Sequence, residues 1–179
     1  MQLKGGNKTP KLLYCAGAPV KVIKSPKPKR ARDMEPIIDH LQITVKDMSV
    51  AIPFYEKMLP LLGFDPQKKG SAVIDEHEFH VMEWSHPRLC FSITSPRKAF
   101  EQESINRRKP GAMHHLAFRA SSRAEVDRLY EELKAIGAMI VSAPREYPEY
   151  VPPGYYALFF KDLEGIKYEI VCHSKSAAE

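Results

Sequence analysis

The sequence predicts an α+β fold built from two tandem βαβββ modules, and three observations lead to this prediction. Residues 111–119 have a shorter segment of similar sequence, residues 38–45, one half-chain earlier. In both copies a histidine, His40 or His115, opens a short alternation of apolar and polar residues, the period-2 pattern of a half-buried strand. In both copies a helical pattern and further strand patterns then follow in the same order. The sequence therefore indicates an internal duplication.

The first module begins with a strand at about residues 37–45 and continues with a helix. Asp47 or Ser49 can serve as its N-cap, and Gly63 ends it. Pro53 is tolerable because it falls in the first turn, where backbone N–H groups lack helical partners. An apolar stripe at helical spacing predicts the face turned to the core: Ile52, Tyr55, Leu59 and Leu62. Two or three strands follow, at residues 72–74, 78–84 and 88–94.

The second module repeats this order after a polar connector. Ser122 and Glu125 form a capping-box pattern, and Gly137 marks the end of the second helix. The apolar stripe of this helix consists of Val126, Leu129, Tyr130, Leu133 and Ile136. A strand at residues 139–142, a Pro- and Tyr-rich loop at 144–154, a strand at 155–161, a turn at 162–165 and a last strand at 166–172 complete the module.

Composition and charge define the domain organisation. The 179 residues carry a net charge of +5 and are 44% hydrophobic. Residues 1–33 hold nine of the 27 basic residues and one of the 22 acidic residues, so residues 34–179 retain 18 basic and 21 acidic residues. We therefore expect a basic, disordered extension at 1–33 and one domain at 34–179, with module one at about 36–95, a connector at 96–110 and module two at 111–173. An arm that binds nucleic acid or an anionic surface is the functional alternative for the extension.

The cellular setting follows from the cysteines and from the hydropathy. Cys15, Cys90 and Cys172 are odd in number and scattered, which argues against a disulfide framework and favours a reducing cytoplasm. No run approaches the roughly 18 apolar residues of a transmembrane helix. Because the positive charge belongs to the extension, the domain itself gives no reason to expect a nucleic-acid partner.

A metal site is the leading functional hypothesis. Strand alternation turns Ile166, Tyr168 and Ile170 toward the helix, so Glu169 points to the opposite face, as does His115. A carboxylate in an apolar strand is costly to bury unless it is paired or binds a metal. His40, His115 and Glu169 together would form the 2-His-1-carboxylate arrangement, which suits Fe(II) and also accepts Mn, Zn, Co or Ni. Histidines that are merely hydrogen-bonded in a polar cup are the alternative.

Further residues are candidates for the wall of a substrate pocket: Ser92, Arg119, Trp84, Tyr150 and Tyr156. Arg119 lies an even number of residues from His115 and could bind an anionic group. His114 should point to the opposite face of the strand and is interpreted as structural. His77 and His80 lie in a hairpin with poor ligand spacing, which favours a solvated strand face.

At this point the chain resembles a known family, the vicinal oxygen chelate superfamily of glyoxalases, extradiol dioxygenases, fosfomycin-resistance transferases and bleomycin-binding proteins. The resemblance covers about residues 34–173 and rests on Asp39-His40-Leu41, on residues 115–118 and on the closing segment 160–171. It implies a U-shaped half-barrel with a metal in its cup, held by His40, His115 and Glu169. Ser92 stands where a glyoxalase would have a second carboxylate, so the chain looks more similar to the three-ligand dioxygenases or transferases.

Two functions of different class follow from the resemblance. The first is a metal-dependent enzyme in which one divalent ion chelates neighbouring oxygens of a small substrate and acts as Lewis acid. The second is a metal-free protein that binds a small molecule or an antibiotic, as bleomycin-resistance proteins do, between Trp84 and tyrosines such as Tyr150 and Tyr156. A homodimer is expected in either case, because open sheet edges invite pairing.

Overall fold

The computed structural model describes residues 38–150 and 154–173. Module one contains β1 (His40–Thr44), α1 (Met48–Leu61), β2 (Lys69–Ile74), β3 (Phe79–His86) and β4 (Leu89–Thr94). Module two contains β5 (Leu116–Arg119), α2 (Arg123–Ala135), β6 (Met139–Glu146), β7 (Tyr156–Lys161) and β8 (Lys167–Cys172). Short 3₁₀ helices at Asp75–His77 and Lys98–Phe100 complete the described elements. The predicted α+β class and the tandem βαβββ order are confirmed. The predicted extension at 1–33 lies outside the described residues.

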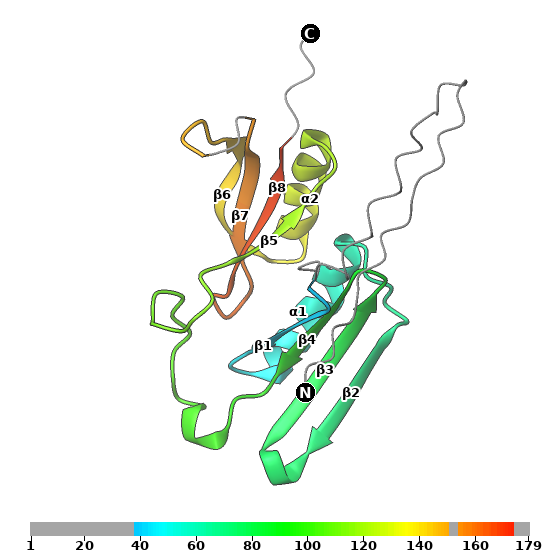
Figure 1. The fold of residues 1–179 in the computed structure, drawn as a ribbon, viewed down its shortest axis with the longest axis vertical. Coiled ribbons are helices and arrows are strands. Elements are labelled where there is room, and N and C mark those ends of the chain that lie inside the picture. Colours follow the sequence, from blue (N-terminus) through cyan, green and yellow to red (C-terminus); the bar gives the residue numbers. More distant parts are fainter. Residues whose placement is uncertain (1–37, 151–153, 174–179) are drawn as a thin grey trace, which may run out of the picture. The chain divides into compact units, whose positions relative to one another are not determined.

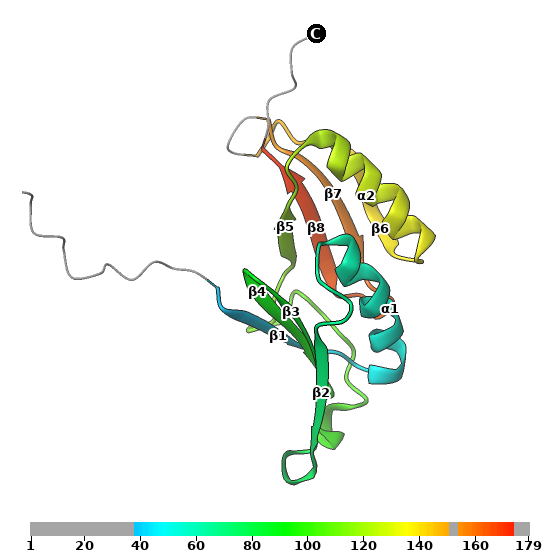
Figure 2. The ribbon, with the colours of Figure 1, turned by 90° about the vertical axis from the view of Figure 1, so that its right-hand side faces the viewer.

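The two sheets have the same topology (Figures 1 and 2). Their strand orders are β1-β4-β3-β2 and β5-β8-β7-β6. In each module the first strand pairs in parallel with the last, while the remaining neighbours are antiparallel. The registers are also equivalent, because Gln42 lies opposite Ser92 in module one and Ala117 lies opposite Glu169 in module two. Ser92 and Glu169 therefore occupy matching positions in the duplication.

The cap of α1 resolves the choice between Asp47 and Ser49. Asp47 is the N-cap, and its carboxylate accepts hydrogen bonds from the backbone N–H of Ser49 at 2.8 Å and from the Ser49 hydroxyl at 2.7 Å. These bonds satisfy a helix-terminal donor and lower the pKa of Asp47. Gly63 follows the helix with a φ of +91°, a conformation that glycine adopts without the strain of a side chain.

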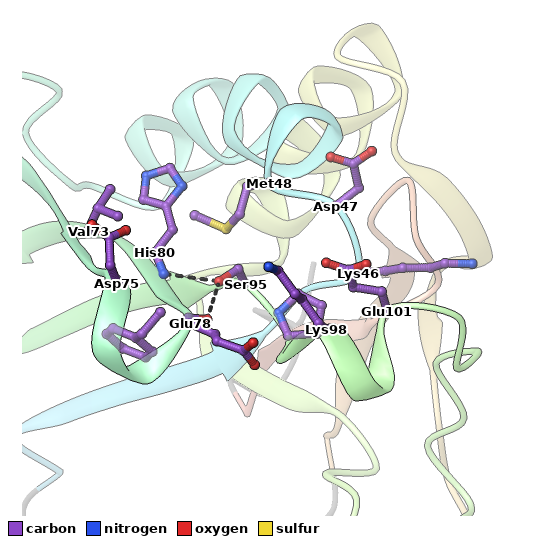
Figure 3. A pocket seen from close by; sticks show the side chains of 12 residues that line it. Lys46, Asp47, Met48, Val73, Asp75, Glu78, His80, Ser95, Lys98 and Glu101 are labelled. Atoms are coloured by element: carbon purple, nitrogen blue, oxygen red, sulfur yellow. Dashed lines mark hydrogen bonds between the residues drawn. The ribbon is translucent and has the colours of Figure 1, made fainter.

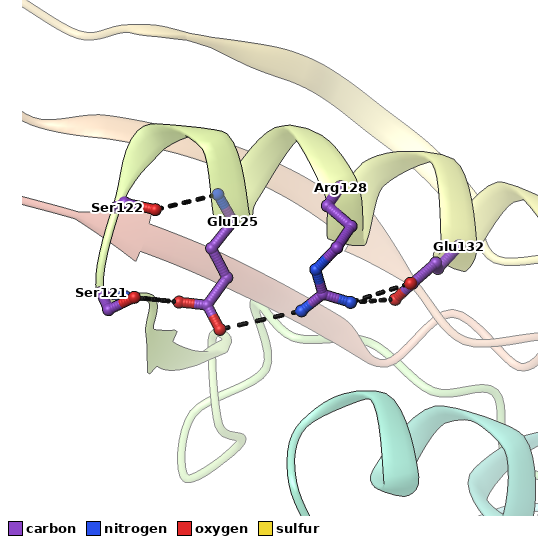
Figure 4. A network of polar contacts seen from close by, with 5 residues as sticks. All are labelled: Ser121, Ser122, Glu125, Arg128 and Glu132. Atoms are coloured by element: carbon purple, nitrogen blue, oxygen red, sulfur yellow. Dashed lines mark hydrogen bonds and ion pairs between the residues drawn. The ribbon is translucent and has the colours of Figure 1, made fainter.

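The cap of α2 follows the predicted capping box with one difference (Figure 4). The Ser122 hydroxyl accepts from the backbone N–H of Glu125 at 3.1 Å. The Glu125 carboxylate accepts from the backbone N–H of Ser121 at 2.7 Å, one residue before the N-cap that a capping box would engage. Arg128 then joins Glu125, at 3.8 Å, to Glu132, at 2.7 Å, along the exposed face of the helix. Exposed pairs of this kind contribute roughly 0.3–0.5 kcal/mol each.

One apolar core joins the helix-facing sides of both sheets to α1 and α2. Tyr55 of α1 is fully buried, with its ring 5.7 Å from Phe91, 6.3 Å from Trp84 and 6.3 Å from Tyr168 of β8. Burial of each such large side chain contributes about 1.5–3 kcal/mol. The predicted stripe of α2 is also buried at Val126, Leu129 and Leu133. Both modules therefore depend on the same core.

The turn after β7 carries a buried carboxylate that contacts α1. Asp162 accepts from the backbone N–H groups of Glu164, Gly165 and Ile166 at 2.8 to 3.0 Å, and from the Tyr55 hydroxyl at 2.8 Å. The Tyr55 and Tyr168 hydroxyls lie 2.5 Å apart. Burial raises the pKa of Asp162 despite these donors. This part of the closing motif is therefore structural, since it joins a turn of module two to a helix of module one.

Glu164, in the same turn, caps the segment that leads into α1. Its carboxylate accepts from the backbone N–H of Lys46 at 2.7 Å and from that of Asp47 at 2.6 Å. These donors precede the helix and have no helical partner, so the long-range contact satisfies them. Burial raises the pKa of Glu164, while the two backbone donors lower it less.

β6 is longer than the sequence predicted. The strand runs to Glu146, whereas the sequence predicted a strand at 139–142 and a loop from Pro144. The register of β6 against β7 shifts between Ile140 and Ser142 and again between Ser142 and Arg145. These irregularities accommodate Pro144, which has no N–H for the ladder. The prediction failed because a proline ends a regular strand but not one that contains bulges.

Candidate functional site

Glu169 is the centre of the candidate site. It lies in β8, is 1% exposed, and has its two carboxylate oxygens engaged by different partners. The Tyr155 hydroxyl donates to Oε1, and His115 Nε2 lies 3.0 Å from Oε2. A buried carboxylate with one phenol and one imidazole is stabilised without a full ion pair. The structure thus brings together two of the three predicted metal ligands, His115 and Glu169.

A chain of hydrogen bonds leads from the connector to this carboxylate. Arg107 Nη1 lies 2.8 Å from His114 Nε2, and His114 Nδ1 lies 2.8 Å from His115 Nδ1. Arginine can only donate, so His114 Nε2 accepts and its Nδ1 carries the proton. His115 Nδ1 then accepts in turn, which leaves the proton of His115 on Nε2, directed at Glu169. Partial desolvation and Arg107 lower the pKa of His114, in keeping with a neutral ring.

His114 differs from its predicted position. The sequence placed it on the face opposite His115, yet the two rings touch, with centroids 5.1 Å apart. The reason is that β5 begins only at Leu116, so strand alternation does not apply to residues 114 and 115. His114 therefore contacts the site instead of the core.

Tyr155 is a site residue that the sequence reasoning missed. Burial, and secondarily Glu169, raise its pKa well above the ordinary value, so the phenol stays protonated and remains a donor. A pattern in the sequence could have found it. Phe159 lies opposite Glu169 in the antiparallel ladder, and strand alternation places residues 155, 157 and 159 on one face.

The pair opens to a cavity of about 480 Å³. Its wall combines aromatic rings with basic groups and contains one carboxylate: His114, His115, Val141, Ser142, Arg145, Tyr147, Tyr150, Tyr155, Phe159, Lys167 and Glu169. Tyr150 is thus the predicted pocket residue that lies beside the His115 and Glu169 pair.

His40 lies apart from this pair. Its side chain is 64% exposed and its Nδ1 is 2.9 Å from the carboxylate of its neighbour Asp39. Within residues 38–150 and 154–173, no group of three or more His, Cys, Asp or Glu side chains converges closely enough to hold a metal ion. Ser92 is 3% exposed and lies on the same face of its sheet as His40, in module one.

The other predicted pocket residues lie elsewhere. Trp84 is 1% exposed and packs against Tyr55 on the helix side of its sheet. Tyr156 also faces the helix side, where its hydroxyl donates to Asp127 at 2.7 Å. Arg119 lines a separate cavity of about 460 Å³ beside α1 and α2. The structure brings none of these three to Glu169. Trp84 lies opposite Phe91 and Tyr156 lies opposite Cys172 in their ladders, so both side chains share the helix-facing side with those buried residues.

A further cavity, of about 690 Å³, lies beside the β2–β3 hairpin (Figure 3). Its wall carries both acidic and basic side chains, among them Lys46, Asp75, Lys98 and Glu101. Ser95 lies in this wall and accepts from the backbone N–H of His80 at 3.0 Å. The Ser95 contact ties the hairpin to the segment after β4. Among the described residues, the wall of this cavity contains no pair comparable to His115 and Glu169.

Fold and site together define a protein of the two-module α+β class with a His–Glu pair in a cavity wall, and sequence comparison identifies the family. A family model described as the Glyoxalase/Bleomycin resistance protein/Dioxygenase superfamily matches residues 37–170. The chain belongs to this superfamily. The YqjT protein of Bacillus subtilis strain 168, itself uncharacterised, is 30% identical over 135 residues, which cover 75% of this chain and 98% of the relative.

Solved structures agree with this family assignment. A glyoxalase-like protein of Bacillus halodurans has a TM-score of 0.60 at 27% identity, over 77% of this chain and 96% of its own. The fosfomycin resistance protein FosX of Listeria monocytogenes, solved with Mn(II) and sulfate, has a TM-score of 0.52 at 17% identity. That match covers 79% of this chain and 95% of FosX, and it supports the fold alone. Among the described helices, none is long and apolar enough to cross a membrane.

Proposed function

We propose that this protein is a metal-dependent enzyme acting on a small molecule, with one divalent ion held by His115, Glu169 and His40. The observation that carries the proposal is the nearly complete burial of Glu169, 3.0 Å from the His115 imidazole and open to a cavity. Imidazole nitrogen and carboxylate oxygen are ligands that Mn, Fe, Zn, Co and Ni accept. Membership of a superfamily that contains glyoxalases and dioxygenases supports an enzymatic role.

The donor chemistry of the pair fits an ion after one proton has moved. As hydrogen-bonded here, His115 Nε2 donates toward Glu169, whereas a metal ligand needs that lone pair free. Moving this proton to Nδ1 of His115 frees Nε2 for a metal. It also removes the hydrogen bond that Nδ1 of His115 accepts from His114, which in turn accepts from Arg107. When bound, the ion supplies Lewis-acid stabilisation to two neighbouring substrate oxygens.

The remaining residues of the cavity have roles that need no ion. Tyr155 holds Oε1 of Glu169 and so keeps the second carboxylate oxygen directed at His115. Phe159 packs edge-on against the His115 ring, with centroids 6.0 Å apart, and restricts its rotation. Such supporting contacts orient ligands and exclude water.

The third ligand, His40, comes in this proposal from a second copy of the chain. β1 and β5 are edge strands of their sheets, and His40 and His115 stand at equivalent positions before or at the start of these strands. An exposed edge pairs readily with another chain, and a two-fold dimer makes each contact twice. A dimer that sets the β1 edge of one chain beside the β5 edge of the other would bring an exposed His40 to each buried pair.

Elemental analysis tests the metal. Protein purified without chelators should hold about one equivalent of a divalent metal per chain, and H115A and E169A should hold almost none. H80A is a matched control, because His80 lines the separate cavity beside the β2–β3 hairpin and should leave the metal content unchanged. A parent protein that holds no metal, and gains no thermal stability from Mn, Fe, Zn, Co or Ni, would overturn the proposal.

Mixing variants tests the shared site. H40A and E169A should each bind little metal alone, while a co-purified hetero-dimer of the two should regain one intact site, or about half of the parent content per chain. The matched control is a mixture of H115A and E169A, which should stay nearly empty of metal because each chain then lacks one residue of its own His115 and Glu169 pair. Failure of the H40A and E169A pair to recover any metal would contradict a site built from two chains.

The hydrogen-bond chain favours a second candidate function, a metal-free protein that binds a small ligand. The order of donors from Arg107 to Glu169 satisfies the carboxylate without an ion. Arg107→Met separates the two candidates, since it removes the group that fixes the tautomer of both histidines. If the site binds metal, the variant should bind it several-fold more tightly, because the proton on His115 is then free to move. A metal-free site should show no metal binding before or after the change.

A further inference from the structure

The aromatic side chains of the Glu169 cavity are arranged as a wall with ordered ring faces. Tyr147 and Tyr150 stack with centroids 5.2 Å apart and planes 8° from parallel. Tyr155 stands at right angles to both, at 6.3 and 5.2 Å, and Phe159 meets Tyr147 edge-on at 5.4 Å. Tyr147 is 4% exposed whereas Tyr150 is 43% exposed, so the inner ring is held by packing and the outer ring is accessible. Such a wall suits a flat conjugated ring, which stacks in offset or edge-on geometry.

Two basic side chains lie over rings of the same wall. Lys167 Nζ is 4.1 Å from the centre of the Phe159 ring, and Arg145 Cζ is 3.8 Å from that of Tyr147. Arg145 also meets Glu149 at 3.9 Å, where both side chains are more than half exposed. The Phe159 ring holds the Lys167 ammonium in place without neutralising its charge, whereas Glu149 partly neutralises the charge of Arg145.

The charge balance of the cavity is positive. Glu169 supplies the one carboxylate of the wall, and both of its oxygens are already engaged by Tyr155 and His115. Lys167 and Arg145 supply two positive charges to the same wall. An anion bound beside Lys167 would gain a charge-assisted contact with its ammonium group.

We propose that the cavity takes a flat aromatic or conjugated ligand that carries an anionic group such as a carboxylate. The ring stacks on the exposed tyrosine of the wall, and the anion meets Lys167 and Arg145. The inference rests on the site named in the proposed function and adds the class of its ligand. Neither the ring wall nor the two cations depend on whether an ion is bound at His115 and Glu169.

Three matched probes test the ligand class by calorimetric titration of the purified protein. They are 2-naphthoate, its saturated counterpart decahydro-2-naphthoate, and the neutral 2-naphthylmethanol. Because both features contribute, 2-naphthoate should bind at least tenfold more tightly than either of the others, a difference of about 1.4 kcal/mol. Equal binding of the two carboxylates, or of the two aromatic probes, would overturn the inference.

Paired variants place the binding in this cavity. Lys167→Met should weaken 2-naphthoate about tenfold and leave 2-naphthylmethanol unchanged. Lys134→Met is the matched control, because Lys134 also lies over a ring, that of Tyr130 at 4.6 Å, but on α2 and away from the cavity. Tyr150→Leu should weaken both aromatic probes, with Tyr130→Leu as its control. The inference fails if the controls lower 2-naphthoate affinity as much as the cavity variants do.

Repeating the titration with H115A separates this inference from the metal proposal. The variant should lose metal and still prefer 2-naphthoate over the two other probes. If the parent binds metal but shows no preference among the probes, the ligand class is wrong and the metal site stands. If it binds no metal but shows the preference, the metal proposal fails and the ligand class stands.

Discussion

The two modules share one backbone plan and differ in the chemistry of the face that points away from the helices. At matching positions, Ser92 faces Gln42 in module one, whereas Glu169 faces Ala117 in module two. Both Ser92 and Glu169 are almost fully buried, at 3% and 1% exposure. Only the second is a charged group with partners, Tyr155 and His115. The comparison teaches that the repeat supplies the positions, while single side chains decide which repeat carries a site.

The closing turns differ as well. In module two the turn at residues 162–165 places Asp162 and Glu164 against α1 of module one, through Tyr55 and two backbone N–H groups. The corresponding connection in module one, at Pro87 and Arg88, is shorter and exposed. The second module therefore stabilises the first through its turn.

The largest effect is expected when this turn loses its carboxylate. Asp162→Ala leaves three backbone donors and the Tyr55 hydroxyl without their acceptor, so the free energy of unfolding should fall by about 3 kcal/mol. Urea denaturation measures it. Asp75→Ala, an exposed acid in the first turn of a 3₁₀ helix, should change it by less than about 0.5 kcal/mol. Equal losses for both variants would show that the turn does not connect the modules energetically.

The second prediction makes module one resemble module two. Ser92→Glu places a carboxylate at the position that matches Glu169, where His115 and Tyr155 have no counterparts in contact. The unfolding free energy should fall by about 2 kcal/mol or more at neutral pH, because the charge is buried without a partner. Gln42→Glu, its exposed neighbour on the paired strand, should be nearly neutral. If Ser92→Glu left the unfolding free energy unchanged, module one would be able to accommodate an equivalent buried carboxylate.

A smaller effect separates two adjacent tyrosines on opposite faces of module two. Tyr155→Phe removes the donor to buried Glu169 and should cost about 1 to 2 kcal/mol in unfolding free energy. Tyr156→Phe removes a bond to Asp127 on the exposed side of α2 and should cost no more than about 0.5 kcal/mol. Thermal or urea unfolding of both variants measures the difference. If Tyr156→Phe cost more than Tyr155→Phe, the hydrogen bond to Asp127 would contribute more to stability than the one to Glu169, contrary to this prediction.

The smallest effect concerns how acid acts on the two helix caps. Hydrogen bonds from Ser121 lower the pKa of Glu125 below its ordinary 4.5, so its stabilisation is present above that value and is lost as the pH falls through the lowered pKa. Burial raises the pKa of Glu164, so the folded state takes up this proton first and gains stability as the pH falls through the raised pKa.

The corresponding glutamine variants should therefore change the acid limb in opposite directions. Glu125→Gln should make the loss of stability on acidification shallower, and Glu164→Gln should make it steeper. The urea midpoint, followed at several pH values from 7 to about 3, reports the slope. Changes of the same sign in both variants would contradict the assignment of opposite pKa shifts.

Much of the fold was predictable because the relevant patterns are local. Helix caps at Asp47 and Ser122 and glycines after both helices mark element ends through their own backbone bonds. Alternation along β8 identified the face of Glu169, since a strand repeats every two residues. The same rule misplaced His114, because it was applied before the strand begins. For Tyr155 alternation gives the face of the side chain but not its contact with Glu169.

The sequence by itself determined the duplication, the α+β class and the face on which Glu169 lies, because these depend on spacing within single elements. The tertiary structure alone decided which predicted residues meet. It placed His115 against Glu169 and left His40 exposed beside Asp39. It brought in Arg107 from the connector, His114 from just before β5 and Tyr155 from just before β7. The physical reason is that alternation specifies the direction of a side chain from its own strand, whereas distances between strands, loops and chains arise only from packing.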